Sequence, residues 1–145
     1  MFDIHFKAAK NMFFDRTLIK SKVDTATRKR LSKFGAYVRQ TSKRSIRKRK
    51  RSSSPGQPPS SHTGLLKQFI YFGYDENRQI VVIGPVVLAR KASGIPEVLE
   101  YGGNVTIQWG KAKGKTVTIE ARPFMGPAFE KELDRMTSLW ANSVR

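Results

Sequence analysis

The sequence has 145 residues, a formal net charge of +17, 39% apolar residues and no cysteine. This length fits one compact domain, and we expect residues 1–145 to form it. The absence of cysteine excludes disulfides, thiolate zinc sites and cysteine nucleophiles. No stretch of about 18 apolar residues is present, and no basic leader precedes an apolar segment. We therefore expect neither a membrane partner nor a secretory signal.

The positive charge is concentrated in the first part of the chain. Residues 1–55 carry 17 Lys or Arg against 3 Asp or Glu, whereas residues 56–145 carry 11 against 8. A positive field of this density favours polyanions, chiefly nucleic acid. The charge could also serve solubility or be neutralised by an acidic neighbouring protein, and the sequence leaves both alternatives open.

The N-terminal part begins with a segment of uncertain order, residues 1–22, in which Phe2, Ile4 and Phe6 alternate with polar residues as in a short strand. A long helix is predicted over residues 23–46. The positions that step by three or four along it are Val23, Thr27, Leu31, Phe34, Val38, Thr41 and Ser45. This spacing is typical of a helix that packs one face against a sheet.

Residues 47–62 follow this helix and contain basic residues, then Ser, Pro and Gly, with no apolar side chain. Such a segment cannot bury itself, so we expect a long, flexible, basic Ser/Pro-rich loop. It is not interpreted as a domain linker, because the preceding helix would then have no core of its own.

The C-terminal part is predicted to contain two hairpins and a last helix. Residues 69–74 pair with residues 79–84, and residues 105–109 pair with residues 116–121. A helical turn at residues 96–101 precedes the second hairpin.

Pro127 suits the first turn of the last helix. The apolar stripe of that helix comprises Phe129, Leu133, Met136, Trp140 and Val144. The predicted class is therefore α+β, with an antiparallel sheet of two hairpins packed against a long N-terminal helix and a C-terminal helix.

No pattern in the sequence points to catalysis, a metal or a cofactor. His5 and His62 are far apart and belong to no nucleophile or metal motif. The Gly- and Lys-rich residues 110–115 lack the spacing of a phosphate-binding loop and fit a hairpin tip. Glu97 and Glu100 would share a helical face, but no partner residues indicate acid–base work. We expect a protein that is not an enzyme.

The basic run, residues 43–51, is a candidate binding site. Its cations are Lys43, Arg44, Arg47, Lys48, Arg49, Lys50 and Arg51. Single-strand binders interleave aromatic residues for base stacking, and this run has none. The pattern favours contact with DNA phosphates without base reading.

A further group of residues is predicted to form a structural and assembly corner. It comprises Glu100, Gly102, Gly103, Arg122, Pro123, Phe124 and Pro127. The glycines allow backbone angles that other residues resist, and the prolines fix a strand-to-helix turn. Phe124 is expected to fill the core. Arg122 is expected to pair with Glu100, either within one subunit or between subunits.

An ordered series of short motifs runs through residues 23–145. The motifs are GAYVR at 35–39, KRSI at 43–46, PGQPP at 55–59, HTGLL at 62–66, VIGP at 82–85, LEYGG at 99–103 and ARPFMGPA at 121–128. In this order and spacing they resemble the head–tail connector, neck and tail-completion proteins of long-tailed bacteriophages and prophages.

The resemblance implies a structural virion protein without enzymatic activity, assembled in the host cytoplasm. It implies an α+β subunit of a homo-oligomeric ring at the neck or upper tail, as tail terminator or neck protein. Its partners would be copies of itself, adjacent connector and tail proteins, and genomic DNA contacted without sequence preference. The alternative from a different class is a free, sequence-independent nucleic-acid-binding protein.

Overall fold

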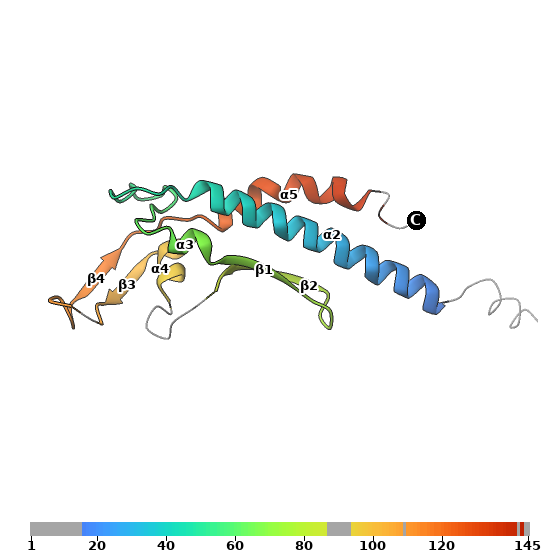
Figure 1. The fold of residues 1–145 in the computed structure, drawn as a ribbon, viewed down its shortest axis with the longest axis horizontal. Helices are drawn as coiled ribbons and strands as arrows, with labels where there is room; N and C mark the ends of the chain where they lie inside the picture. The colour runs from blue at the N-terminus through green and yellow to red at the C-terminus, as the bar shows by residue number, and fades with distance from the viewer. Residues whose placement is uncertain (1–15, 87–93, 109, 142, 144–145) are drawn as a thin grey trace, which may run out of the picture.

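The structure is a computed structural model that describes residues 16–86, 94–108, 110–141 and 143. The described chain has the predicted α+β class (Figure 1). Its elements are α2 (Arg16–Ser45), α3 (Leu65–Gln68), β1 (Ile70–Asp75), β2 (Ile80–Pro85), α4 (Ile95–Tyr101), β3 (Gly103–Thr106), β4 (Thr116–Ile119) and α5 (Gly126–Trp140). The strand expected at residues 2–6 lies outside the described residues.

The long helix α2 begins at Arg16, seven residues before the predicted start at Val23. Residues 16–22 contain neither Gly nor Pro, so nothing in them stops the helix from extending. Figure 1 shows this end of α2 reaching past both the β1–β2 hairpin and α5. Val23 is consequently 41% exposed, whereas Phe34 and Val38, farther along the predicted stripe, are each 1% exposed.

The first predicted hairpin is confirmed and packs against α2. β1 and β2 pair antiparallel, with Phe72 opposite Ile83 and Tyr74 opposite Val81. The approach to α2 is close at Gly35. A Cβ there would stand 2.7 Å from Cγ2 of Val81 and 3.0 Å from Cδ2 of Phe72. Glycine at this position therefore sets how near the hairpin lies to the helix.

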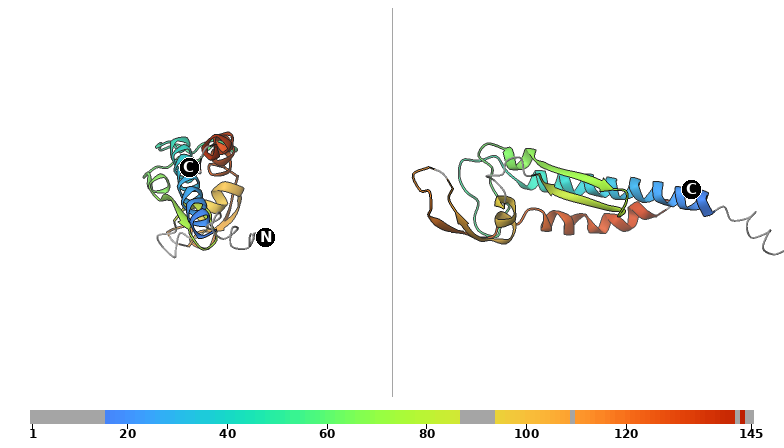
Figure 2. Two further views of the ribbon diagram at one scale, coloured as in Figure 1. Left: turned by 90° about the vertical axis from the view of Figure 1, so that its right-hand side faces the viewer. Right: turned by 90° about the horizontal axis from the view of Figure 1, so that it is seen from below.

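The second predicted hairpin is also confirmed, but it forms a separate two-stranded antiparallel sheet, β3–β4, so the expectation that both hairpins share one sheet was wrong. The helical turn expected before it is α4. Figures 1 and 2 show the β3–β4 hairpin at the end of the molecule opposite the start of α2. The molecule is elongated, with the two hairpins at different places along its length.

The core consists of two neighbouring clusters of buried apolar residues. One joins α2 to α5 and contains Phe34, Val38, Ala128 and Leu139. The other joins the end of α2 to β1 and to the start of α5, and contains Ile46, Ile70 and Phe124. Figure 1 shows α2 and α5 running side by side in opposite directions.

The buried face of α5 differs from its most apolar stripe. Its buried residues are Ala128, Glu132 and Leu139. Along the apolar stripe Met136 packs on the core, but Phe129 is 43%, Leu133 42% and Trp140 37% exposed. Val144 lies outside the described residues. We call Phe129, Leu133 and Trp140 the α5 stripe.

The segment between α2 and α3 contains no helix or strand, but its expected flexibility is not confirmed. Its backbone is anchored by bonds from Ser61 N–H to the Arg47 carbonyl at 3.0 Å and from Gly56 N–H to the Ala121 carbonyl at 2.8 Å. Pro59 is buried, as is Ser61 at 8% exposed. The premise that this segment cannot bury any of its residues was therefore wrong for residues 59 and 61.

Candidate nucleic-acid interface

The structure divides the basic run among three environments. Lys43 turns toward β1 and α3, where its Nζ lies 5.7 Å from the centre of the Tyr71 ring and 3.4 Å from the Gln68 carbonyl oxygen. Burial, with smaller effects of the charges on Arg39 and Lys67, lowers the pKa of Lys43. Lys43 therefore packs against the fold and does not extend with the rest of the run.

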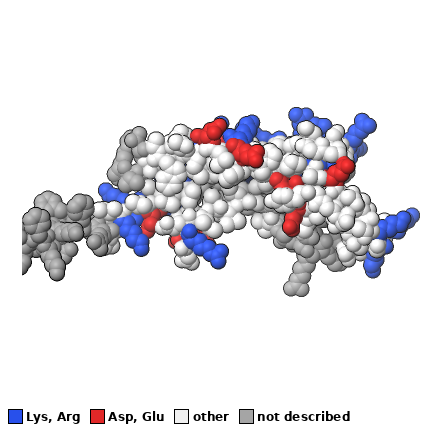
Figure 3. All heavy atoms as spheres, turned by 180° about the vertical axis from the view of Figure 1, so that it is seen from behind, with Lys and Arg blue, Asp and Glu red and all other residues white. Residues whose placement is uncertain are grey.

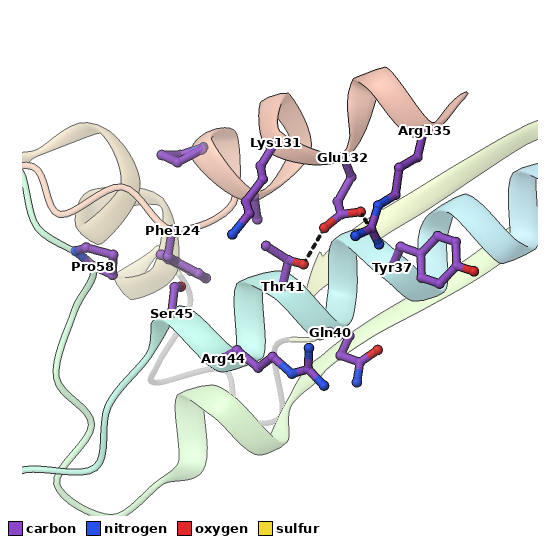
Figure 4. A pocket seen from close by; sticks show the side chains of 12 residues that line it. Tyr37, Gln40, Thr41, Arg44, Ser45, Pro58, Phe124, Lys131, Glu132 and Arg135 are labelled. Atoms are coloured by element: carbon purple, nitrogen blue, oxygen red, sulfur yellow. Dashed lines mark hydrogen bonds and ion pairs between the residues drawn. The ribbon is translucent and has the colours of Figure 1, made fainter. Parts of the chain in front are cut away.

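Arg44, the next residue, lies about 100° farther around α2. It lines a groove of about 450 Å³ between α2 and α5 (Figure 4). Lys131 and Arg135 of α5 line the same groove. Glu132, 2% exposed, lies between the two helices. The Thr41 hydroxyl donates to Oε1 of Glu132 at 2.6 Å.

The buried charge of Glu132 is balanced by Arg135, whose Nη1 lies 3.1 Å from Oε2. Oε2 accepts no well-aligned hydrogen bond from the described residues. The described lining contains no second carboxylate and no histidine. The described residues also contain no group of three or more His, Cys, Asp or Glu placed to hold a metal ion.

Residues 47–51, which we call the basic loop, are all exposed and carry one cation each. Ile46 lies between α2 and the basic loop and is 1% exposed. It anchors the chain in the second core cluster at the point where the loop begins. Beyond this anchor an isolated bridge pairs Arg47 with Ser60. The five side chains therefore project from a fastened base into solvent.

Two further cations that were not singled out in the sequence lie near Lys43. Arg39 donates from Nε to the Ile70 carbonyl at 2.8 Å, and its guanidinium lies 5.6 Å from the centre of the Tyr71 ring. Lys67 contributes to lowering the pKa of Lys43. The four-residue spacing of Arg39 and Lys43 on one helix was the available signal. Nothing local in the sequence linked Lys67 to them.

The predicted corner is assembled as a helix cap. Glu100 accepts from the backbone N–H groups of Phe124 and Met125 at Oε2, at 2.9 and 3.0 Å, and from Gly126 at Oε1, at 2.7 Å. These are the unpaired donors at the start of α5, where a carboxylate is electrostatically favoured. Phe124 is 1% exposed, as expected of a core residue.

The predicted pair between Arg122 and Glu100 was wrong within the subunit. Arg122 donates instead to two backbone carbonyls, that of Ser53 at 3.1 Å and that of Glu120 at 3.2 Å. Because Glu100 already accepts three backbone N–H groups, its oxygens are committed to α5. Arg122 therefore fastens the connection between α2 and α3 to the strand end after β4.

The glycines and prolines of the corner have distinct surroundings. Gly102 has φ +78°, and a Cβ there would stand 3.1 Å from the Ala121 nitrogen, so this position requires glycine. Gly103 has φ +143° with open space around it. Pro123 is partly buried, and Pro127 lies exposed in the first turn of α5. The corner thus combines one tight contact, at Gly102, with a proline-fixed entry to α5.

Within the described residues, no helix has the length and apolar character needed to cross a membrane. Comparisons of the chain with protein-family models, with curated proteins and with solved structures found no match.

Proposed function

We propose that this protein is a structural virion subunit without enzymatic activity, which forms a ring at the head–tail junction of a tailed bacteriophage. The motif series over residues 23–145 supports the phage assignment by resemblance. The exposed basic loop supports proximity to the genome. Within the virion the subunit would contact copies of itself and the adjacent connector and tail proteins.

The observation that carries self-assembly is the apolar surface of the isolated subunit. In the described part of the chain, eight apolar residues are buried whereas fifteen large ones are exposed. The α5 stripe is the most regular of these surfaces, because its members recur along one helix face. Exposed apolar patches of this kind mark surfaces that a partner covers.

A closed ring requires head-to-tail contacts, in which two different surfaces of neighbouring copies meet. The α5 stripe would supply one of these surfaces. If the basic loop of each subunit faces the DNA path, the ring carries one copy of its positive charge per subunit around that path.

Sedimentation velocity of the purified chain tests the assembly, and Leu133→Glu is the informative variant. The wild type is expected to sediment as a closed oligomer and Leu133→Glu as a monomer with an unchanged melting temperature. Ser138→Glu is the matched control, because Ser138 is also exposed on α5 but lies on a different face. A wild type that stays monomeric, or an oligomer that Leu133→Glu leaves intact, contradicts the proposal.

Electron microscopy of assembled particles tests the location. The subunit density is expected as a ring between head and tail. Its absence from that position would remove the virion assignment.

A second candidate function is a monomeric protein that binds nucleic acid without sequence preference. The five exposed cations of the basic loop favour it. The two functions separate in the same sedimentation experiment, because a free binder remains monomeric in the absence of nucleic acid.

A further inference from the structure

The tip of the β3–β4 hairpin carries three exposed lysines, Lys111, Lys113 and Lys115, to which the proposed function assigns no role. We call residues 110–115 the lysine tip. Its backbone is held in shape by bonds from Lys113 N–H to the Gly110 carbonyl at 3.2 Å and from Gly114 N–H to the Ile107 carbonyl at 2.8 Å. Gly110 and Gly114 have φ of +80° and +86°, which these turns require.

The lysine tip and the basic loop lie at the same end of the elongated molecule (Figures 1 and 2). They are also joined. The connection that follows the basic loop is fastened to the strand end after β4 by the bond from Gly56 N–H to the Ala121 carbonyl and by Arg122 Nε on the Ser53 carbonyl. The basic loop and the lysine tip, about 60 residues apart in sequence, are therefore both connected to the strand end after β4.

The charge at this end is nearly all of one sign. Residues 46–64 contain no acidic residue, and residues 103–121 contain one, Glu120. On the face drawn in Figure 3, Lys and Arg side chains project both above and below this end of the molecule, and acidic side chains are visible between them and farther along the molecule. The eight exposed cations outnumber the exposed carboxylates of the adjoining segments, Glu120 after β4 and Glu97 on α4, and form a site that favours a polyanion.

We propose that the lysine tip and the basic loop act together as a two-part clamp on the phosphate backbone of double-stranded DNA. The DNA contact of the basic loop belongs to the proposed function, and the inference rests on that part of it. The lysine ammonium is a compact point charge, and phosphate contacts of this kind carry no sequence information. A turn already ordered by hydrogen bonds loses little conformational entropy when its lysines engage phosphates.

Duplex DNA is the ligand that this arrangement favours over a single strand. Base stacking on a single strand requires aromatic side chains, and the described residues of both projections contain none. Two separated clusters of point charges instead suit a backbone with one charge per about 1.7 Å of helix axis.

The test is the salt dependence of binding to a fluorescent DNA duplex, measured by anisotropy with two unrelated sequences. If all eight cations meet phosphates, log affinity falls with log salt at a slope of about −7. Changing Lys111, Lys113 and Lys115 together to Gln is expected to reduce the slope to about −4 to −5. Changing all five residues of the basic loop to Gln is expected to reduce it to about −3.

The matched control changes Lys20, Lys22 and Lys29 to Gln. These three lysines are exposed on α2 toward its N-terminal end, so the control removes the same net charge elsewhere. It is expected to keep the wild-type slope. All substituted residues are exposed, and equal melting temperatures would exclude misfolding as the cause of a lost slope.

The outcomes distinguish this inference from the proposed function. A lysine-tip variant with the slope of the control overturns the clamp, and a flattened slope for the basic-loop variant would then leave the proposed DNA contact standing. If neither variant changes the slope, both DNA assignments fail, while sedimentation still decides ring assembly. Displacement of the protein from duplex by polyglutamate or single-stranded DNA more readily than by unlabelled duplex also overturns the assignment.

Discussion

The backbone N–H of Phe124 donates to Oε2 of Glu100 at 2.9 Å, across 24 residues of sequence. This bond brings together two functions of the corner, since Glu100 satisfies the first donors of α5 while Phe124 fills the second core cluster. The start of α5 is thus fixed both by a carboxylate and by a buried ring. Its direction along α2, and the place where the α5 stripe is presented, depend on this junction.

Glu100→Ala is expected to lower the free energy of unfolding by about 2–3 kcal/mol, because three backbone donors lose a charged acceptor. Glu100→Gln keeps one acceptor oxygen and is expected to lose roughly half as much. Urea unfolding measures both. Glu97→Ala is the control on the same helix, with an expected loss below about 1 kcal/mol. Equal losses for Glu97→Ala and Glu100→Ala would refute the cap.

Phe124→Ala is expected to cost about 3–5 kcal/mol, the usual range for removing a buried aromatic ring. For a chain of this size the melting temperature should fall by roughly 6–20 °C. Phe129→Ala removes a half-exposed ring whose centre lies 5.7 Å from that of Phe34, edge to face. It is expected to lower the free energy of unfolding less than Phe124→Ala does and to weaken assembly more. Calorimetry and sedimentation together give both readouts. A Phe124→Ala protein with wild-type melting would place this ring outside the core.

Trypsin is expected to cut first within residues 47–51, because these five basic residues are exposed and carry the cleavage specificity. Arg122→Ala removes the bonds to the Ser53 and Glu120 carbonyls and is expected to accelerate that cleavage severalfold. The free energy of unfolding should fall by only about 1 kcal/mol. Timed digestion followed by mass spectrometry identifies the sites. An unchanged cleavage rate would show that Arg122 does not fasten this segment.

Gly35→Ala tests the close packing of α2 on the first hairpin. Alanine is favoured over glycine by about 1 kcal/mol inside a helix, so an open site would gain stability. Here the added Cβ would meet Val81 at 2.7 Å, and overpacking typically costs about 1–3 kcal/mol. We expect a net loss of up to about 2 kcal/mol by urea unfolding. Pairing the variant with Val81→Ala should restore part of the loss, and a stabilised single variant would contradict this packing.

Most elements of the fold were predictable because their signals are local. The alternation and turn residues of both hairpins, the glycines after α4 and Pro127 at the start of α5 each act within a few residues. The extent of α2 was underestimated, because residues 16–22 carry helix propensity without a capping signal. The buried face of α5 was not predictable from apolarity. The side of α5 that faces α2 includes Glu132, which does not belong to the apolar stripe. The Thr41 hydroxyl and the Arg135 guanidinium stabilise the Glu132 carboxylate there.

The candidate site was predictable in composition and only partly in arrangement. Charge density identified residues 43–51, but the direction of each side chain depends on its angle around α2, which sends Lys43 and Arg44 to different neighbours. The long-range partner of Arg122, the Ser53 carbonyl, was missed because it lies 69 residues away in a segment without regular structure. The link between the basic loop and the lysine tip is tertiary, and no spacing in the sequence expresses it.

The contact between Thr41 and Glu132, separated by 91 residues, has a consequence for biosynthesis. A ribosome adds about 5–20 residues per second, so α5 follows α2 by an interval on the order of 5–20 s. During that interval Phe34 and Val38 have no helix to cover them, and the nascent chain presents an adhesive apolar strip. Helix α5 therefore closes this part of the core after α2, and a stable protomer requires that α5 has left the ribosome.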